Sequence, residues 1–362
     1  MHDISIREMT PSDMPLIEEL VGYRPELNPE SAKKRTRLMQ WIAFNNPCAN
    51  GVPTYFVALK NNKIIGYHGR MPCKFNVKGK VVNGYYIHDL YVDPEIREKG
   101  LGFFLTRALA KEIENKSDDF FVLIWMTKLN LLIQRRMGYT ELDKKIATYK
   151  KVLKSKKYLE TFLKPRLLAS IAAPLVDGVL WLMEKLGSPG SSRGPKLTPI
   201  DRFDERFDDL FQRVSKSMGI SSIKSSNVLN WRYIDRPYPR DKVYALEQDN
   251  QIKGFVVLCE NPRDPCQGEI MELVADPDDH LTIKSLLHQS VNLFKDKGYH
   301  SIGCFMSNEH FSRYLRKFGF LKRTNEKVML IGNCNPADLD ILTDLQNWHI
   351  MRAESDGYML NF

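Results

Sequence analysis

Residues 89–102 read Asp89-Leu90-Tyr91-Val92-Asp93-Pro94-Glu95-Ile96-Arg97-Glu98-Lys99-Gly100-Leu101-Gly102, and they join an apolar strand to an apolar helix. Within the turn, Arg97, Gly100 and Gly102 have the spacing Arg-x-x-Gly-x-Gly. Backbone N–H groups at such a helix start can converge on a pyrophosphate, and the helix dipole favours its charge. Glycines let the backbone approach the ligand closely. The pattern therefore predicts a phosphate-binding turn, with a plain turn that binds no ligand as the alternative.

The chain repeats one order of motifs in its two halves. In the first half, Trp41 is followed by Gly66, Asp89 and Gly138. The matching residues of the second half, at offsets of 190, 188, 183 and 181, are Trp231, Gly254, Glu272 and Gly319. Such a slow drift is typical of a duplicated domain with small insertions, and a length of 362 residues also suggests two domains.

We therefore predict two mixed-sheet α/β domains in tandem. The first covers residues 1–152, the second covers residues 200–362, and a helical and basic linker covers residues 153–199. In the first domain, strands are expected over Ile4–Arg7, Tyr55–Leu59, Lys63–Gly66, Val81–Val92 and Phe120–Met126, and helices over Met14–Tyr23, Leu101–Asn115 and Leu129–Met137. The tail that ends at Val152 is expected to supply the last two strands of the first sheet.

Composition and charge exclude several classes of protein. With 43% apolar and 27% charged residues, the chain has the composition of a globular protein and not of a disordered one. The net charge of +9 is concentrated in Lys144–Arg166, which holds nine basic residues and one acid, Glu160. A nucleic-acid groove needs basic charge spread over a face, so no nucleic-acid partner is expected.

The cysteines and the N-terminus point to a reducing compartment. The six cysteines include no CxxC pair, which argues against a structural zinc site and for free thiols. Met1–Met9 is polar and has no apolar segment of a signal peptide. We expect a cytoplasmic protein that needs no metal.

At these residues the sequence resembles the GNAT superfamily of acyl-CoA-dependent N-acyltransferases. Ile6–Asp13 is similar to the family's opening strand and first helix, Asp89–Gly102 to its acyl-CoA motif, and Gly138-Tyr139 to its closing Gly-aromatic step. The resemblance covers Ile4–Val152 and Leu197–Asn333, which implies a tandem member. In the second unit, the positions of Arg97, Gly100 and Gly102 are taken by His280, Ile283 and Ser285. Acyl-CoA binding is therefore expected in the first unit only.

The resemblance implies that an acetyl or other short acyl group moves from coenzyme A to an amine acceptor, without a metal. The pantetheine arm would lie along Leu90–Val92, and backbone N–H groups near Tyr91 and Val92 would stabilise the oxyanion. The implied contacts to acetyl-CoA come from Tyr91, Val92, Arg97, Glu98, Lys99, Gly100, Leu101 and Gly102.

Asp89 is the candidate catalytic residue. It occupies a strand position where family members often carry an acidic base, so it would act as the base or hold a water. The alternative is a satisfied polar residue at a strand bulge. Its neighbour His88 is expected to point to the opposite face of the sheet, because side chains alternate along a strand.

One departure concerns the general acid. Family members often carry a tyrosine at the position of Gln134 and an asparagine at the position of Thr127. The second unit has Asn308 at the latter position but Leu315 at the former. Either the thiolate leaves without help, or a water or Tyr139 substitutes, or the unit binds acyl-CoA without turnover.

Two other functions therefore stay open: a non-catalytic acyl-CoA-sensing module, and an aminoacyl-tRNA-dependent peptide-bridge transferase, which also uses tandem GNAT-like folds. The lack of a broad basic face speaks against the latter. The sequence does not indicate the acceptor, the acyl chain length, the role of the second domain or the oligomeric state.

The connecting segment has its own composition. Leu167–Leu186 is apolar but interrupted by Pro174 and Asp177, so it is too short to span a membrane, and Gly187–Pro199 is a Gly/Pro/Ser linker. Next to the basic run, such a helix could make a peripheral membrane contact. We instead expect it to pack between the two domains.

Overall fold

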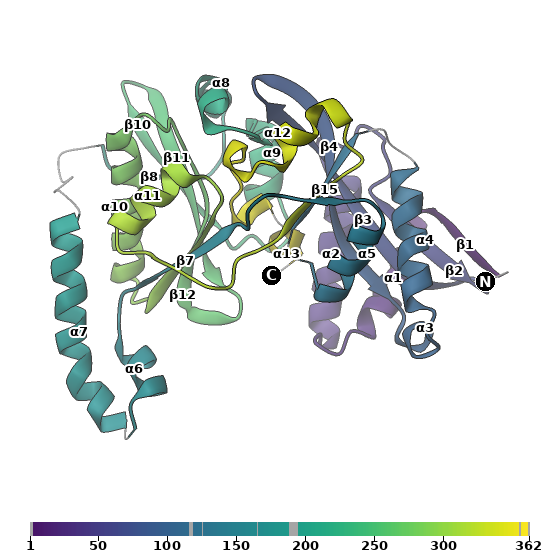
Figure 1. Ribbon diagram of the computed structural model, residues 1–362, viewed down its shortest axis with the longest axis horizontal. Helices are drawn as coiled ribbons and strands as arrows, with labels where there is room; N and C mark the ends of the chain where they lie inside the picture. Colours follow the sequence, from purple (N-terminus) through teal and green to yellow (C-terminus); the bar gives the residue numbers. More distant parts are fainter. Residues whose placement is uncertain are drawn as a thin grey trace.

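The computed structural model describes residues 3–115, 119–124, 126–164, 166–187, 195–354 and 356–360. They form two mixed sheets that lie beside each other, each covered by helices (Figure 1). This confirms the predicted α/β fold with two mixed-sheet units. The linker expected over Gly187–Pro199 falls mostly outside the described residues.

The first sheet contains most of the N-terminal half. Its strands, in spatial order, are β1 (Ile4–Glu8), β2 (Tyr55–Lys60), β3 (Lys63–Val77), β4 (Lys80–Val92), β5 (Phe120–Ile124), β15 (Met329–Gly332) and β6 (Thr140–Glu141), and β9 (Ser221–Ser222) pairs with β3. Strands β1 to β4 are antiparallel neighbours, whereas β4 and β5 are parallel. Strand β3 is much longer than the four residues expected, because the β3–β4 hairpin continues to the turn at Lys78-Gly79.

The second sheet repeats this arrangement. Its order is β14 (Leu321–Lys322), β7 (Ala147–Val152), β13 (Ser301–Met306), β12 (Asp264–Ala275), β11 (Gln251–Asn261), β10 (Lys242–Gln248) and β8 (Leu197–Ile200). Here β12 and β13 are the parallel pair, as β4 and β5 are in the first sheet. Asp89 in β4 and its repeat partner Glu272 in β12 therefore lie on corresponding strands.

The two units exchange one strand each. Strand β7 pairs with β13 in the second sheet, with Ser301 opposite Val152, and β15 pairs with β5 in the first sheet, with Met329 opposite Ile124. The expectation that the tail to Val152 closes the first sheet is therefore wrong for β7. Its residues are alternately buried and half-buried, a pattern that fits either sheet, so the sequence alone could not assign the strand.

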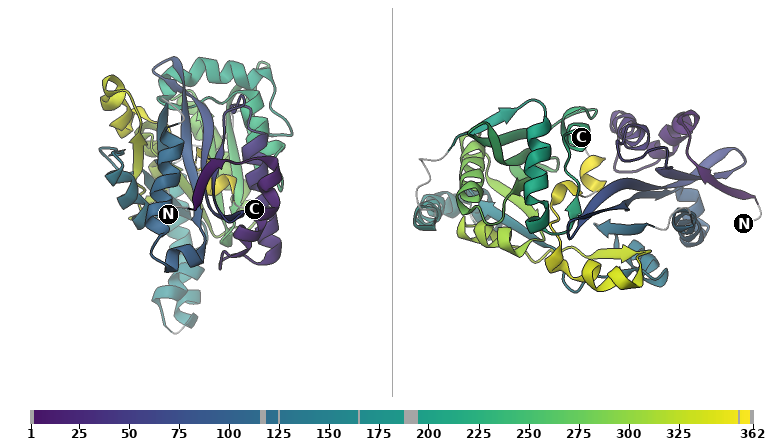
Figure 2. Two further views of the ribbon diagram at one scale, coloured as in Figure 1. Left: turned by 90° about the vertical axis from the view of Figure 1, so that its right-hand side faces the viewer. Right: turned by 90° about the horizontal axis from the view of Figure 1, so that it is seen from above.

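Helices cover both faces of each sheet (Figure 2). In the first unit, α1 (Met14–Gly22) and α2 (Pro29–Phe44) lie on one face, and α3 (Pro94–Glu98), α4 (Gly102–Glu114) and α5 (Lys128–Arg136) follow the strands β4 and β5. In the second, α8 (Glu205–Met218), α9 (Ser226–Leu229) and the π-turn Asn230–Ile234 precede β10, and α10 (His280–Asp296) and α11 (Glu309–Lys317) follow β12 and β13. The C-terminal segment adds α12 (Leu339–Thr343), α13 (Asp356–Met359) and short 3-10 turns.

A single hydrophobic cluster joins the units through their inner faces. It includes Ile17 and Met39 of the first unit and Phe207 and Val257 of the second, all fully buried. Two further clusters lie on the outer faces, under α4 in the first unit and under α10 and α11 in the second. The two sheets therefore share an inner core.

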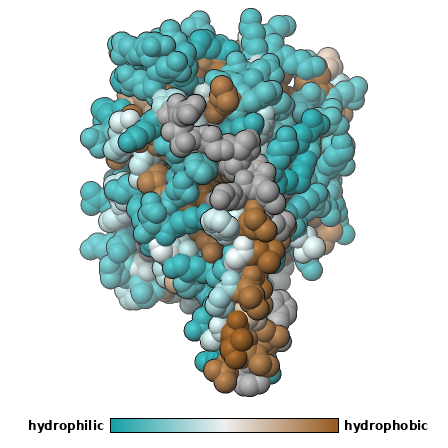
Figure 3. Space-filling model, turned by 90° about the vertical axis from the view of Figure 1, so that its left-hand side faces the viewer, coloured by the Kyte–Doolittle hydropathy of each residue, from teal (hydrophilic) through white to brown (hydrophobic). Residues whose placement is uncertain are grey.

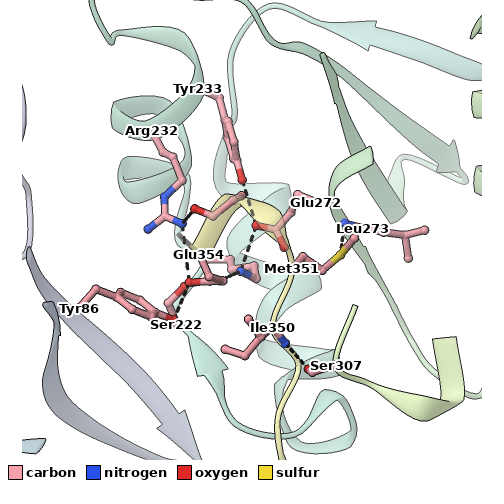
Figure 4. A network of polar contacts seen from close by, with 12 residues as sticks. Tyr86, Ser222, Arg232, Tyr233, Glu272, Leu273, Ser307, Ile350, Met351 and Glu354 are labelled. Carbon is pink, nitrogen blue, oxygen red and sulfur yellow. Dashed lines mark hydrogen bonds and ion pairs between the residues drawn. The ribbon is translucent and has the colours of Figure 1, made fainter. Parts of the chain in front are cut away.

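A buried polar network also links the units (Figure 4). The Glu354 carboxylate accepts hydrogen bonds from Lys224 Nζ at 2.6 Å, Ser222 Oγ at 2.8 Å and Tyr86 Oη at 2.8 Å. Lys224 also lies 3.2 Å from Glu272. Because Tyr86 belongs to β4 and Glu272 to β12, this network connects the two central strands of the protein.

Two helices project from the second unit. Helices α6 (Lys156–Phe162) and α7 (Arg166–Gly187) pack on each other and extend beyond the sheets (Figure 1). The expectation that the apolar helix is buried between the two domains is therefore wrong. Among the described residues, no helix combines the length and apolarity needed to cross a bilayer.

Candidate functional site

Strands β4 and β5 separate partway along their length. Within the described residues they pair at Gly84, Tyr85 and Tyr86, and β4 continues to Val92 beyond the last of these pairings. The Asp93 N–H donates to Ile65 O at 2.9 Å. Because ladder bonds of antiparallel strands alternate, the N–H of Val92 points to the other edge of β4, away from β3. A ligand can pair with this open edge in place of a strand.

The turn that follows β4 leads directly into α4. The Asp93 side chain caps α3 by accepting from the Glu95 N–H at 2.9 Å. Gly100 has a φ of +74°, in the left-handed region, and no atom of the described residues lies within 4 Å of the position that a Cβ would take. At Gly102, a Cβ would lie 3.0 Å from Arg97 Cγ and 3.4 Å from Arg97 Cα. Gly100 thus adopts a backbone conformation that favours glycine, and Gly102 lets the start of the helix lie close to Arg97.

The first turn of α4 can hold an anion. Helix starts leave backbone N–H groups without intrahelical acceptors, and no side chain caps this one at Leu101. No acidic residue lies in the first turn either, so the positive end of the helix dipole is not neutralised locally. The side chains of Arg97 and Lys99 in the preceding loop are exposed. These residues fit a pyrophosphate.

Two guanidinium groups lie over the ring of Tyr91 at the end of β4. The Arg24 guanidinium is 4.2 Å from the ring centroid of Tyr91, and that of Arg97 is 5.5 Å from it. Arg24 comes from the segment after α1, so it links the helical face of the unit to the end of β4. The Tyr91 hydroxyl is buried without a hydrogen-bond partner within the described chain.

Asp89 occupies a β-bulge in β4. Its φ is +47°, and the pairing shifts so that Asp89 and Leu90 together oppose His68 of β3. The Tyr55 hydroxyl lies 3.4 Å from both Asp89 Oδ2 and His88 Nδ1. His88 and Asp89 therefore share one face of the sheet, and the expectation of opposite faces is wrong. The bulge breaks the alternation on which that expectation depended.

Two arginines pair with the Asp89 carboxylate. Arg35 of α2 lies 2.5 Å from Oδ1, and Arg24 lies 3.1 Å from the same oxygen. Burial by itself would raise the pKa of Asp89, but the two guanidinium groups outweigh burial and lower the pKa below its ordinary value. A carboxylate held in this way is a weak base. Its contacts favour a role in positioning the bulge.

Two histidines lie beside this ion cluster. His68 Nδ1 is 3.1 Å from the backbone oxygen of His88, and both Nε2 atoms are buried without a hydrogen-bond partner among the described residues. Burial lowers the pKa of each imidazole to about 4. The ring of His88 fits because residue 69 is glycine: a Cβ there would lie 2.7 Å from the ring. Both side chains are neutral at pH 7.

His68 and His88 should make the stability of the protein sensitive to mild acid. Their pKa is about 4 when folded and about 6.5 when unfolded, so the unfolded chain binds more protons between these values. The contribution of these two neutral histidines to the unfolding free energy is present in full above pH 6.5 and is lost as the pH falls toward 4. We expect His88→Gln to reduce the loss of unfolding free energy between pH 7.5 and 5.5 by roughly 1.4 kcal/mol. Urea titrations at the two pH values measure this, and equal losses in the parent and the variant would contradict it.

The residues considered as general acid are not suited to that role. Gln134 is fully buried, its Nε2 lies 3.4 Å from Asn130 Oδ1, and Thr127 caps α5 by accepting from the Asn130 N–H. Burial and the Glu114 carboxylate raise the pKa of Tyr139 well above its ordinary value. Tyr139 contacts Glu114, which is the last residue of α4. Because a helix rises 1.5 Å per residue, this places Tyr139 roughly 18 Å from the first turn of α4. This distance argues against Tyr139 as the substitute acid.

The second unit lacks an anion site at the corresponding helix. Asp279 caps α10 by accepting from the Thr282 N–H at 2.9 Å and from its hydroxyl at 2.7 Å. Its carboxylate therefore takes the place that a phosphate would need, and it repels a phosphate electrostatically. Residues His280, Ile283 and Ser285 lie in this capped helix, and Ile283 and Ser285 are buried. Acyl-CoA binding in the first unit only therefore stays a prediction, and the cap at α10 is one reason for it.

Several residues of the cluster could not be found from short motifs. Arg24, Arg35 and Tyr55 reach Asp89 from other elements, and Tyr67 accepts a hydrogen bond from Arg24 at 2.7 Å. The spacing of Arg24 and Arg35 across the α1–α2 connection carries no recognisable pattern. The described residues hold no group of three or more His, Cys, Asp or Glu side chains arranged for a metal.

Residues 16–131 match the model of the acetyltransferase (GNAT) family. This part of the chain is a GNAT domain. The match includes the β4–α4 turn and the elements that carry Arg24 and Arg35. No curated protein matches the chain.

Solved structures resemble the chain over both units. Saccharomyces cerevisiae N-myristoyltransferase with bound myristoyl-CoA is 13% identical, with 96% of this chain and 88% of that chain covered and a TM-score of 0.58. GCN5-related N-acetyltransferases from Kribbella flavida and Anabaena variabilis are 13% and 12% identical, with 91% and 92% of this chain and 70% and 73% of those chains covered, and TM-scores of 0.59 and 0.61. At these identities the likeness shows the fold, and it extends beyond the GNAT domain.

Proposed function

We propose that the GNAT domain is an N-acyltransferase that moves an acyl group from coenzyme A to an amine acceptor. The observation that carries this proposal is the continuity of β4 and α4. One strand–turn–helix offers an open strand edge for the pantetheine arm and an uncapped helix start for the pyrophosphate. The contacts to acyl-CoA would come from Tyr91, Val92 and the loop residues 97–102.

The transfer can proceed without a side chain that acts as general base or general acid. The amine nitrogen attacks the thioester carbonyl, the C–S bond breaks, and the proton that the amine loses balances the one that the thiolate gains. The outward N–H of Val92 would donate to the oxyanion. Arg24, which lies against Tyr91 at the same end of β4, adds a positive charge that stabilises the leaving thiolate in place of an acid.

The donor and the acceptor are separate questions. Acetyl-CoA is the donor that we propose to test first, followed by acyl-CoAs of increasing chain length, because a structural neighbour binds myristoyl-CoA. Release of free coenzyme A thiol with a panel of amines (polyamines, amino sugars, peptides) tests for turnover. If acyl-CoA binds but no amine supports thiol release, the protein is an acyl-CoA-sensing module, the alternative that Gln134 favours.

Asp89 provides the sharpest test of how the site works. Asp89→Asn removes the charge that holds Arg24 and Arg35, so we expect kcat to fall by roughly 10²-fold while the Kd for acyl-CoA stays near the parent value. The matched control is Asp13→Asn. Asp13 is also buried and paired with an arginine, Arg7 at 2.6 Å, but it lies at the start of α1 away from β4.

Asp89→Asn loses a buried ion cluster, and Asp13→Asn loses a pair whose arginine is 43% exposed. Both variants are expected to lose stability, and only Asp89→Asn is expected to lose turnover. Full activity in Asp89→Asn would leave Asp89 as a structural residue alone. An equal loss of kcat in Asp13→Asn would show that the effect comes from general destabilisation.

A peptide-bridge transferase that uses aminoacyl-tRNA shares the tandem fold and is the third candidate. Calorimetry with acetyl-CoA separates it from the other two, because only they require coenzyme A binding. The uncapped start of α4 favours coenzyme A as the ligand.

A further inference from the structure

Helix α7 exposes a continuous row of apolar side chains, which we call the apolar stripe. Its members are Leu167, Leu168, Ile171, Leu175, Val179 and Leu182, between 48% and 73% exposed. Figure 3 shows them as a brown band along the projecting helix. At 100° per residue they fall within an arc of about 120°. That arc contains no charged residue between Leu167 and Leu182.

The opposite side of α7 is fixed to the protein. Ala169 and Ala173 are buried there. Asp177 Oδ1 accepts from the Ser155 N–H at 2.7 Å, and the Ser155 hydroxyl donates to Ala173 O at 3.2 Å. These contacts fix the rotation of the helix about its axis. The apolar stripe therefore faces away from the body of the protein. Isolated exposed leucines are common on protein surfaces, but a row of this length is not.

Exposed basic side chains lie at the start of α7 and beside its middle. Lys164 and Arg166 are at the start of the helix, and Lys154 and Lys156 flank Ser155, which contacts Ala173 and Asp177. All four belong to the run of nine basic residues with one acid. A cavity of about 630 Å³ lies nearby, and Lys150, Arg263 and Arg323 are among its lining residues. Lys157 of α6 pairs with Asp264 of that lining at 3.0 Å, which places the cavity beside the projecting helices.

We propose that α6 and α7 form an arm that binds an anionic membrane surface, with α7 lying in the interface. The apolar stripe would enter the boundary between headgroups and acyl chains, and the basic side chains would contact acidic headgroups. Because α7 is not apolar enough to span, it lies in the plane of the interface. A second copy of the chain fits less well, since pairing two stripes would bring two strongly basic segments together.

Co-sedimentation of the full chain with vesicles tests this proposal. Vesicles of phosphatidylcholine with 30% phosphatidylserine should, as an order-of-magnitude expectation, bind at least ~10-fold more protein than phosphatidylcholine alone at low salt, with the difference shrinking as salt screens the charges. Ile171→Glu/Leu175→Glu should abolish binding. The matched control is Leu281→Glu, which changes an equally exposed leucine, 78% exposed, on α10.

A basic-residue variant tests the second half of the proposal. Lys154→Gln/Lys156→Gln/Lys164→Gln should weaken binding to the anionic vesicles and remove most of the salt dependence. All these positions are exposed, so thermal unfolding and acyl-CoA affinity should match those of the parent and confirm that the variants fold. The assay contains no acyl-CoA, so its result is independent of the proposed transferase activity.

Three outcomes would overturn the proposal. The parent protein could stay in the supernatant with anionic vesicles at low salt. The glutamate variant on the apolar stripe could bind as the parent does. Finally, sedimentation velocity could show a parent dimer that the same variant abolishes, which would assign the stripe to a second copy of the chain.

Discussion

Gly100→Asp should abolish acyl-CoA binding. Gly100 is exposed, has a φ of +74° and has open space where a Cβ would be, in the loop that leads into α4. An aspartate there would place its carboxylate where the pyrophosphate is expected. A like charge about 4 Å from a phosphate costs roughly 4 kcal/mol at a protein surface. Even with salt screening, we expect calorimetry to show a Kd increased by at least about 100-fold.

The matched control for this variant is Gly100→Asn. Asparagine has the same size and tolerates a positive φ as well as aspartate does, but it carries no charge. We expect it to weaken binding much less than aspartate does. Equal effects of the two substitutions would mean that bulk or backbone conformation matters and not charge. Unchanged affinity in Gly100→Asp would remove the assignment of this loop to acyl-CoA.

Glu354→Ala should destabilise the whole protein. Burial by itself would raise the pKa of Glu354, but Lys224 and Arg232 outweigh burial and lower the pKa to about 2, so the carboxylate is charged. Without this carboxylate, Lys224 still pairs with Glu272, but Arg232 loses its ion pair with residue 354. The hydroxyls of Tyr86 and Ser222 lose their hydrogen-bond acceptor (Figure 4). Removing one partner of such a buried network costs about 3–5 kcal/mol. Denaturant titration at pH 7 measures the loss.

An exposed ion pair provides the comparison. Glu309 lies 2.6 Å from Arg316 on α11, and both side chains are close to half exposed. Glu309→Ala should change the unfolding free energy by about 1 kcal/mol or less. If Glu354→Ala costs no more than this, the central network does not stabilise the junction of the two units.

The sequence predicted the local architecture of the first unit well. The β4–α4 turn was visible because its glycines and Arg97 are close together in the chain, and the helix that follows has clear apolar spacing. Helix α2 was not predicted, since the basic residues near its middle, Lys33, Lys34, Arg35 and Arg37, hide the apolar period. This omission mattered, because α2 supplies Arg35 to Asp89.

Features that depend on distant pairing could not be assigned from the sequence. A bulge at Asp89 was only an alternative, because it is a property of how β3 and β4 pair, and the side of the sheet that His88 faces was misjudged. Strand β7 alternates as any half-buried strand does, and only contacts with β13, about 150 residues later, assign it to the second sheet. The membership of a strand in one of two similar sheets is decided by long-range packing.

The exchange of β7 and β15 also affects how the chain is made. The edge of β5 that faces β15 stays open until residues 329–332 leave the ribosome, about 200 residues after β5. At 5–20 residues per second this takes roughly 10–40 s. During that interval the nascent first sheet exposes an apolar, hydrogen-bonding edge, which is a template for aggregation. The two halves must therefore fold together, and each half alone would lack a strand of its sheet.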